Sequence, residues 1–150
     1  MAGISIGFQV SQPSDIEMLV AIRIAAMKES LENIGRFDPQ RARERLIENF
    51  RPADTTLVLL DETIIGFYAL LRSEGIIKVE HFYILPAYQS RGIGKVVLDA
   101  IKKDARKSSC KIILSALKES KSNQFYTANG FILYEEEPFD NLYHWKNQQA

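Results

Sequence analysis

Hydrophobic residues alternate with polar or small ones over residues 4–10, and this period of two predicts a half-buried β-strand. Over residues 16–31 the apolar residues instead recur at helical spacing, which predicts an amphipathic α-helix. Ser14 comes just before that stretch, and Glu17 follows three residues later, within its first turn. We interpret these two residues as the capping box of the helix. An Asp-Pro pair then predicts the start of a second helix over residues 39–49.

The same patterns predict alternating strands and helices along the rest of the chain. We expect strands at residues 55–60, 63–71, 76–85, 111–117, 131–136 and 142–146, and helices at residues 92–106 and 122–128. The strand, helix and strand over residues 76–117 predict a parallel strand pair with a right-handed crossover. The loop after residue 85 would then lie at the carboxyl end of a strand, where open α/β sheets bind ligands. The predicted fold class is therefore α/β.

Composition places the chain among ordinary globular proteins. With 150 residues, 46% of them hydrophobic and 25% charged, it has the size and content of one domain, which we assign to residues 1–150. A net charge of zero argues against a protein that mainly binds nucleic-acid phosphates. The single cysteine excludes an internal disulfide and favours the reducing cytoplasm, and no apolar stretch is long enough to span a membrane.

The neutral total conceals an uneven distribution of charge. Residues 1–85 carry a net charge of −3, residues 86–121 carry +6, and residues 122–150 carry −3. A basic segment within a neutral protein suggests a local anionic ligand. A solvated basic helix face is the alternative interpretation of the same charges.

The basic segment begins at a glycine-containing loop, Gln-Ser-Arg-Gly-Ile-Gly at residues 89–94, between a predicted strand and a predicted helix. Glycines allow backbone N–H groups to face a ligand, and the helix N-terminus adds partial positive charge. Together with Arg91 and Lys95, this loop suits a diphosphate, although it matches neither G-x-G-x-x-G nor a Walker A loop. A strand-to-helix turn that needs its glycines only for packing is the alternative.

Two segments resemble motifs of one enzyme family. Residues 84–95 are similar to the acetyl-CoA-binding signature of the GNAT family of N-acetyltransferases, whose core is Gln/Arg-x-x-Gly-x-Gly/Ala. Residues 123–131 resemble the Phe-Tyr-x-x-x-Gly-Phe element of that family and follow at its usual spacing. The resemblance implies the GNAT fold, classed as α/β or in some schemes α+β: a single mixed, largely antiparallel sheet of about seven strands with four flanking helices. Its splayed parallel strand pair would hold the cofactor.

The resemblance also implies acetyl-CoA as the acetyl donor and no metal. The main chain around Ile84 would bind the pantetheine arm, and the N–H groups of Arg91 to Lys95 would hold the pyrophosphate. Ser120 stands where the family often has an asparagine that binds the arm, and serine has a shorter reach. The expected cofactor-binding residues are Ile84, Gln89, Ser90, Arg91, Gly92, Ile93, Gly94, Lys95 and Ser120.

The resemblance assigns two catalytic roles. Tyr126 matches the general acid of the family, because a phenol with a pKa of about 10 stays protonated at neutral pH; packing beside Phe125 is the alternative. Glu80 matches a position of the base, acting directly or through water; a salt bridge or a contact with the substrate ammonium is the alternative. Lys78 departs from the family at the other base position. His81 falls on the opposite face of this strand, so we interpret it as structural.

These residues predict an N-acetyltransferase that moves the acetyl group of acetyl-CoA to a primary amine of a small molecule or peptide by direct attack. A catalytically degenerate acyl-CoA-binding sensor and an interaction module of the same fold are the alternatives. We expect a cytoplasmic monomer or homodimer with no nucleic-acid or membrane partner. His144, on a late strand, is expected either to line the acceptor side or to pack.

Overall fold

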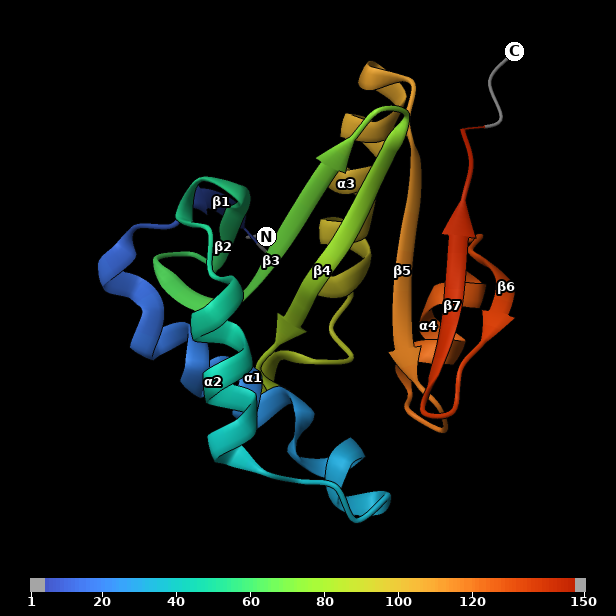
Figure 1. Ribbon diagram of the computed structural model, residues 1–150. Coiled ribbons are helices and arrows are strands. Elements are labelled where there is room, and N and C mark those ends of the chain that lie inside the picture. The colour runs from blue at the N-terminus through green and yellow to red at the C-terminus, as the bar shows by residue number, and fades with distance from the viewer. Residues whose placement is uncertain (1–4, 148–150) are drawn as a thin grey trace. The chain divides into compact units, whose positions relative to one another are not determined.

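The computed structural model describes residues 5–147, and its elements follow the predicted order (Figure 1). The strands are β1 (Ile6–Val10), β2 (Thr55–Leu60), β3 (Thr63–Ser73), β4 (Ile76–Ile84), β5 (Lys111–Leu117), β6 (Ile132–Glu136) and β7 (Asp140–Trp145). The helices are α1 (Ile16–Asn33), α2 (Pro39–Asn49), α3 (Ile93–Ser108) and α4 (Ser122–Ala128). The strands pair in the order β1-β2-β3-β4-β5-β7-β6, with β4 and β5 parallel and the other pairs antiparallel, which confirms the predicted mixed sheet.

The starts of the first two helices test the predicted caps. Asp38 accepts a hydrogen bond from the Arg41 N–H at 3.1 Å at the start of α2, as the Asp-Pro pair predicts. The predicted capping box of α1 is wrong, because Ser14 lies within a 3₁₀ turn that precedes the helix. The Gln12 N–H instead donates to the Asp15 carboxylate at 2.8 Å, two residues earlier than expected.

The chain divides into two compact units, and β3, β4 and α3 contribute to both. The first unit comprises Met1–Ala69 and His81–Val96, and the second comprises Leu70–Glu80 and Val97–Ala150. The single domain predicted for the whole chain stays a prediction. In the first unit α1 packs against α2, and one hydrophobic cluster joins both helices to β2 and β3: Leu19, Val20, Ile22, Leu46, Leu57 and Phe67.

Arg23 of α1 is a buried charge in the first unit, with 7% of its surface exposed. Its Nη1 donates to the Ala42 carbonyl of α2, and its Nε donates to the Tyr83 hydroxyl of β4 at 3.3 Å. The guanidinium also lies 5.9 Å from the centre of the Tyr83 ring, within cation–π range. Arg23 therefore ties both helices to the end of β4.

In the second unit the side chains of β5 alternate between two faces of the sheet. Ile112 and Leu114 are at most 3% exposed, whereas Ile113 is partly exposed. Ile112 stands opposite Trp145 of β7, and Trp145 lies beneath Arg106 of α3. The helices therefore cover the face that carries the buried residues, and in Figure 1 they lie behind the strands of this unit. The face that carries Ile113 is turned toward the reader.

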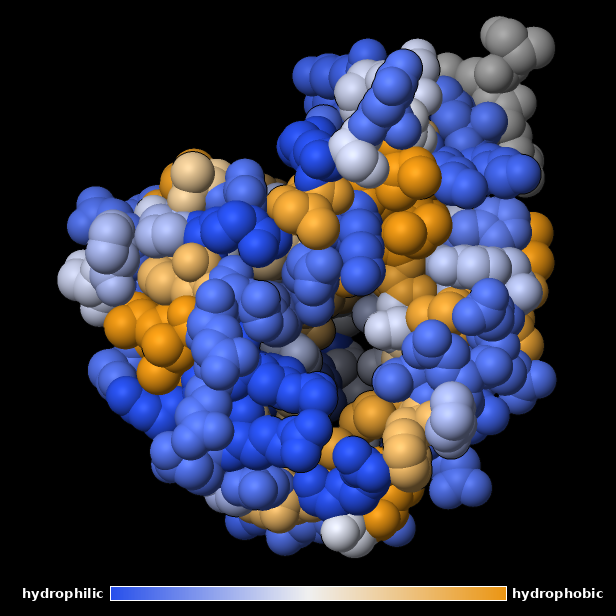
Figure 2. Space-filling view, viewed as in Figure 1, coloured by the Kyte–Doolittle hydropathy of each residue, from blue (hydrophilic) through white to orange (hydrophobic). Residues whose placement is uncertain are grey.

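β6 is the outermost strand on the β7 side of the sheet, and all five of its residues are exposed. Three of them are large and apolar or aromatic, with exposed fractions of 43–59%: Ile132, Leu133 and Tyr134. Figure 2 shows hydrophobic surface between hydrophilic side chains along this margin. The sheet therefore ends in an open strand with a mixed surface.

β3 and β4 approach each other closely at Gly66. A Cβ at this position would lie 2.3 Å from the Tyr83 carbonyl oxygen and 2.8 Å from Cδ1 of Ile84. Both distances are too short for a real contact, so the backbone would have to shift. The next hydrogen bond, from the Leu85 N–H to the Ile65 carbonyl at 2.8 Å, continues this close pairing. Glycine at position 66 therefore determines how the end of β4 lies on β3.

We expect Gly66→Ala to lower the free energy of unfolding by about 1–3 kcal/mol, because the added Cβ forces the two backbones apart. Gly7→Ala is the matched control in a strand, since its Cβ would meet its nearest neighbour, Leu59 Cβ, at 4.0 Å. Urea denaturation of both variants measures the difference. Equal stabilities would contradict the steric argument.

Candidate active site

The predicted diphosphate loop begins where β4 ends in the first unit. Pro86–Tyr88 form a 3₁₀ turn in which the Tyr88 N–H donates to the Leu85 carbonyl at 2.9 Å. Proline fits the first position of such a turn because it has no N–H to lose. The strand therefore ends at this turn, and the loop follows it as the sequence predicts.

Gln89 holds this loop against the strand. Its Nε2 donates to the Ile84 carbonyl at 2.8 Å, so the side-chain amide supplies a hydrogen-bond donor to the last carbonyl of the strand. Ile84 itself is 8% exposed. Both residues are expected to bind the cofactor, and this hydrogen bond gives Gln89 a second role that its place in the motif does not reveal.

The tip of the loop contains two residues with positive φ angles. Ser90 and Gly92 have φ angles of 63° and 81°, in the left-handed region that favours glycine. A Cβ on Gly92 would meet nothing within 4 Å, so its backbone conformation, rather than packing, explains the glycine. The Arg91 guanidinium lies 5.4 Å from the centre of the Tyr88 ring. The packing alternative for the glycines therefore does not account for Gly92.

α3 starts directly after this tip. Ile93 is buried at 1% exposure and anchors the first turn, and the Gly92 carbonyl accepts a hydrogen bond from the Val96 N–H at 3.3 Å. The first turn of a helix directs its backbone N–H groups outward and carries partial positive charge, which favours anions. Gly94 and Lys95 lie in this first turn. The loop, Arg91 and the helix start thus bring together the groups that suit a diphosphate.

Tyr126 lies on α4 in the second unit and is 6% exposed. Its ring centre is 5.5 Å from that of Phe125, 5.7 Å from that of Phe131 and 6.0 Å from that of Tyr143. Its carbonyl accepts the Phe131 N–H at 3.0 Å. This aromatic cluster explains the burial of Tyr126, as the packing alternative expects. Its role as general acid stays a prediction.

Asn123 is a positioning residue that the sequence patterns do not identify. Its Nδ2 donates to the Leu117 carbonyl at 2.8 Å and to the Ser120 carbonyl at 2.9 Å. Its Oδ1 accepts from Asn141 Nδ2 at 2.9 Å and from the Tyr143 hydroxyl at 2.7 Å. One amide therefore joins the end of β5, the first turn of α4 and β7, and it sets the place of the helix that carries Tyr126.

Ser120 belongs to this same turn. Its N–H donates to the Leu117 carbonyl at 3.1 Å, and its Oγ accepts from Asn123 Nδ2 at 3.3 Å. The preceding Glu119 has a φ angle of 69°, so the chain turns tightly here. In this structure the Ser120 hydroxyl is part of the turn, and its contact with a cofactor stays a prediction.

Glu80 forms an ion pair on β4 in the second unit. Lys78 Nζ lies 3.4 Å from Glu80 Oε1, and the Glu80 side chain is 29% exposed. Residues two positions apart on a strand share a face, so the sequence predicts this proximity. The pair agrees with the salt-bridge alternative, and the assignment of Glu80 as base stays a prediction.

His81 packs in the first unit, as its position on the strand predicts. Its Nδ1 lies 3.4 Å from the Tyr83 hydroxyl, and its ring centre is 6.2 Å from that of Phe67. Its surroundings are therefore those of a structural histidine, beside the hydroxyl that Arg23 also binds.

Residues 5–147 contain neither a cluster of metal ligands nor a helix that could span a membrane. No three or more His, Cys, Asp or Glu side chains in this part of the chain come together as metal ligands. None of its helices is long and apolar enough to cross a membrane.

Comparisons with known proteins identify the domain type. The family model described as an acetyltransferase (GNAT) domain matches residues 25–145. No curated protein matches the chain by sequence. The fold resembles the paia N-acetyltransferase of Thermoplasma acidophilum in complex with coenzyme A, with a TM-score of 0.76, 20% identity, and coverage of 95% of this chain and 99% of that one. An acetyltransferase of Thermus thermophilus gives a TM-score of 0.77 at 14% identity, covering 98% and 100% of the two chains.

A larger protein shares the same fold over part of its length. N-acetylglutamate synthase of Neisseria gonorrhoeae, complexed with coenzyme A and N-acetyl-glutamate, gives a TM-score of 0.68 at 14% identity. The alignment covers 99% of this chain and 36% of that one.

We expect Asn123→Ala to lower the free energy of unfolding by about 1–3 kcal/mol, because the partners of this amide lose their hydrogen bonds. Gln124→Ala, at an exposed neighbouring position of α4, is the control and is expected to have little effect. Thermal and urea denaturation measure both. The Asn123 network would be unimportant if the two variants proved equally stable.

Proposed function

Because the chain belongs to the family of GNAT acetyltransferases, we propose that it transfers the acetyl group of acetyl-CoA to a primary amine of a small molecule or peptide. The observation that carries the proposal is the family match across residues 25–145, which includes the loop after β4 and the first turn of α3. The coenzyme A bound to the structurally similar Thermoplasma and Neisseria proteins supports the same donor.

In this proposal the loop after β4 binds the donor. The N–H groups from Arg91 to Lys95 hold the pyrophosphate, aided by the partial charge at the start of α3 and by the Arg91 guanidinium. The main chain at Ile84 and the Ser120 turn contact the pantetheine arm. Gln89 keeps the loop against the end of β4. Preformed donors of this kind bind an anion without first having to be ordered.

The chemistry requires one proton to leave the amine and one to reach the departing thiolate. The lone pair of a neutral primary amine attacks the carbonyl carbon of the thioester, so that the C–N bond forms and the C–S bond breaks. Glu80, once its ion pair with Lys78 has opened or rearranged, accepts the N–H proton that the nitrogen loses as this bond forms, directly or through water. Tyr126 donates its phenolic proton to the sulfur, and its aromatic cluster fixes the ring for this role.

The proposal also covers the domain, the cellular location, the oligomeric state and the class of acceptor. We infer a single catalytic domain over residues 1–150, acting in the cytoplasm as a monomer or homodimer on an amine that is not part of a nucleic acid or membrane. The net charges of −3 in the first and last segments of the chain would favour a cationic acceptor.

Two measurements test the proposal. Titration with acetyl-CoA should raise the melting temperature as the concentration increases, because the ligand binds only the folded state. Release of free thiol from acetyl-CoA should accelerate when amines are added from a panel of polyamines, amino acids, aminoglycosides and peptides. Binding without turnover on any amine would instead favour the acyl-CoA sensor, and the absence of binding would favour the interaction module.

With an amine that supports turnover, we expect Tyr126→Phe to lower kcat about a hundredfold, because the thiolate loses its proton donor. The affinity for acetyl-CoA should barely change, since the phenyl ring keeps its place in the aromatic cluster. Tyr134→Phe, at an exposed tyrosine of β6, is the control and should leave kcat unaltered. Steady-state thiol release measures both variants. Unchanged turnover in Tyr126→Phe would refute the role of Tyr126 as acid.

A further inference from the structure

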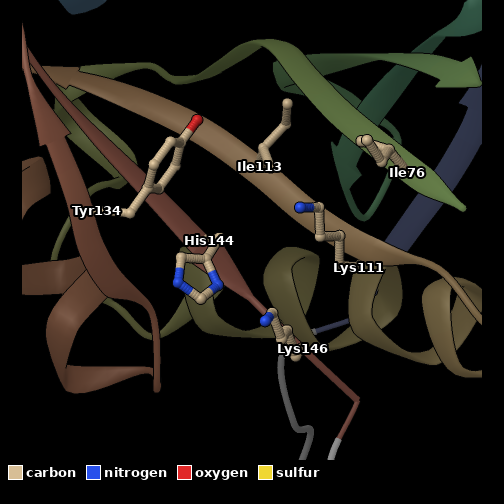
Figure 3. Close-up of a pocket in the computed structure, with 6 residues that line it drawn as sticks. All are labelled: Ile76, Lys111, Ile113, Tyr134, His144 and Lys146. Carbon is tan, nitrogen blue, oxygen red and sulfur yellow. The ribbon is translucent and has the colours of Figure 1, made fainter.

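The face of the sheet opposite the helices of the second unit contains a hollow of about 270 Å³. Four neighbouring strands contribute its wall: Ile76 from β4, Lys111 and Ile113 from β5, Tyr134 from β6, and His144 and the adjoining Lys146 from β7. Figure 3 shows the imidazole of His144 between the tyrosine ring and the two lysine side chains. The hollow thus combines two cations, an imidazole and a phenol with two isoleucines.

The register of the sheet brings the two lysines together. Ile112 stands opposite Trp145 in the antiparallel pairing of β5 with β7, so Lys111 is opposite Lys146 one step further along. Like charges directly opposite each other on neighbouring strands repel. Within residues 5–147, neither ammonium has a carboxylate within 4.0 Å. The described part of the chain therefore supplies no carboxylate that pairs with this concentration of positive charge.

His144 lies in the wall of the hollow beside the two lysines. Its Nδ1 is buried and has no hydrogen-bond partner among the described residues, which is uncommon for a buried polar atom. Its ring packs edge-on against Tyr134, with the centroids 5.4 Å apart. Burial lowers the pKa of the imidazole below its ordinary value of 6.5, and the charges of Lys146 and Lys111 lower it further. His144 is therefore a neutral group in a positive environment.

We propose that this hollow binds a small organic carboxylate with a flat apolar body, such as a one-ring aromatic acid. The carboxylate lies between the ammonium groups of Lys111 and Lys146, where it removes their repulsion and forms charge-assisted hydrogen bonds. The imidazole ring of His144 forms part of the wall beside the carboxylate. Ile76 and Ile113 contact the apolar body, and the Tyr134 ring forms one side.

This site is separate from the proposed catalytic groups. His144 alternates along β7 with Tyr143, and Tyr143 is the residue that contacts Tyr126 on the helix-covered face. The hollow therefore opens on the opposite face of the sheet. It also lies at the start of β4, four residues before Glu80 and so about 13 Å from it along the strand. Its ligand is a second ligand of the protein, and its binding does not depend on acetyl transfer.

The test uses benzoate as the probe, in the absence of acetyl-CoA, with NMR detection of the two histidine rings. We expect benzoate to shift the His144 resonances in a saturable manner while His81, in the first unit, stays unchanged as an internal control. Benzyl alcohol lacks the charge and inorganic phosphate lacks the apolar body, so each should bind at least about tenfold more weakly. A non-saturating shift, or equal affinity for either comparison ligand, would overturn the proposal.

Two variants locate the binding. Lys111→Gln and Lys146→Gln should each weaken benzoate binding by about threefold or more, whereas Lys103→Gln, at an exposed position of α3, should leave it unaltered. Each pocket variant removes a repulsion between like charges, so its melting temperature should match or exceed that of the unmodified protein. A loss of benzoate binding in these variants is then not caused by unfolding. Wild-type affinity in both pocket variants would show that benzoate binds elsewhere.

Discussion

The parallel pairing of β4 with β5 is the constraint on which the rest of this structure depends. Two parallel strands cannot be joined by a hairpin, so the chain needs a crossover, and here the crossover is α3. The connection from β4 to α3 must then leave the carboxyl end of a strand and enter the amino end of a helix. Both of these ends favour ligands, and the helix end favours anions. The diphosphate loop is thus a consequence of strand direction as much as of its glycines.

Side-chain amides hold the two segments to which we assign functional roles. Gln89 fastens the loop to the last carbonyl of β4, and Asn123 fastens the first turn of α4 to β5 and β7. An amide can donate and accept at once, so Asn123 satisfies backbone carbonyls with its Nδ2 and accepts from two side chains with its Oδ1. Tight turns leave such backbone groups without partners in regular structure, and these two residues supply them. The aromatic cluster around Tyr126 adds the apolar part of the same support.

Local signals predict the elements well because each depends on residues close in the chain. The strands at residues 55–60 and 111–117 and the helix at residues 122–128 occur with the expected bounds, and the cap at Asp38 forms as expected. The capping box of α1 fails because the Gln12–Asp15 contact begins a 3₁₀ turn first, while Glu17 pairs with Arg43 on another helix. A sequence pattern does not show that competition.

Interactions between distant positions account for what the sequence could not predict. Asn123 binds residues 18 and 20 positions later, so its role emerges only once β7 lies beside β5. The juxtaposition of Lys111 with Lys146 likewise depends on the register between β5 and β7, and a count of charges along the sequence does not show this register.

The open outer strand has a consequence for the behaviour of the protein at high concentration. An unpaired strand edge with apolar side chains is a template for self-association, because another chain can add to its hydrogen bonds. In β6 the apolar residues at positions 132–134 are followed by glutamates at positions 135 and 136, and a third glutamate, Glu137, comes directly after the strand. Their charges act as gatekeepers, since two copies aligned on this edge would bring carboxylates together. The colloidal stability of the molecule therefore depends on keeping these glutamates ionised.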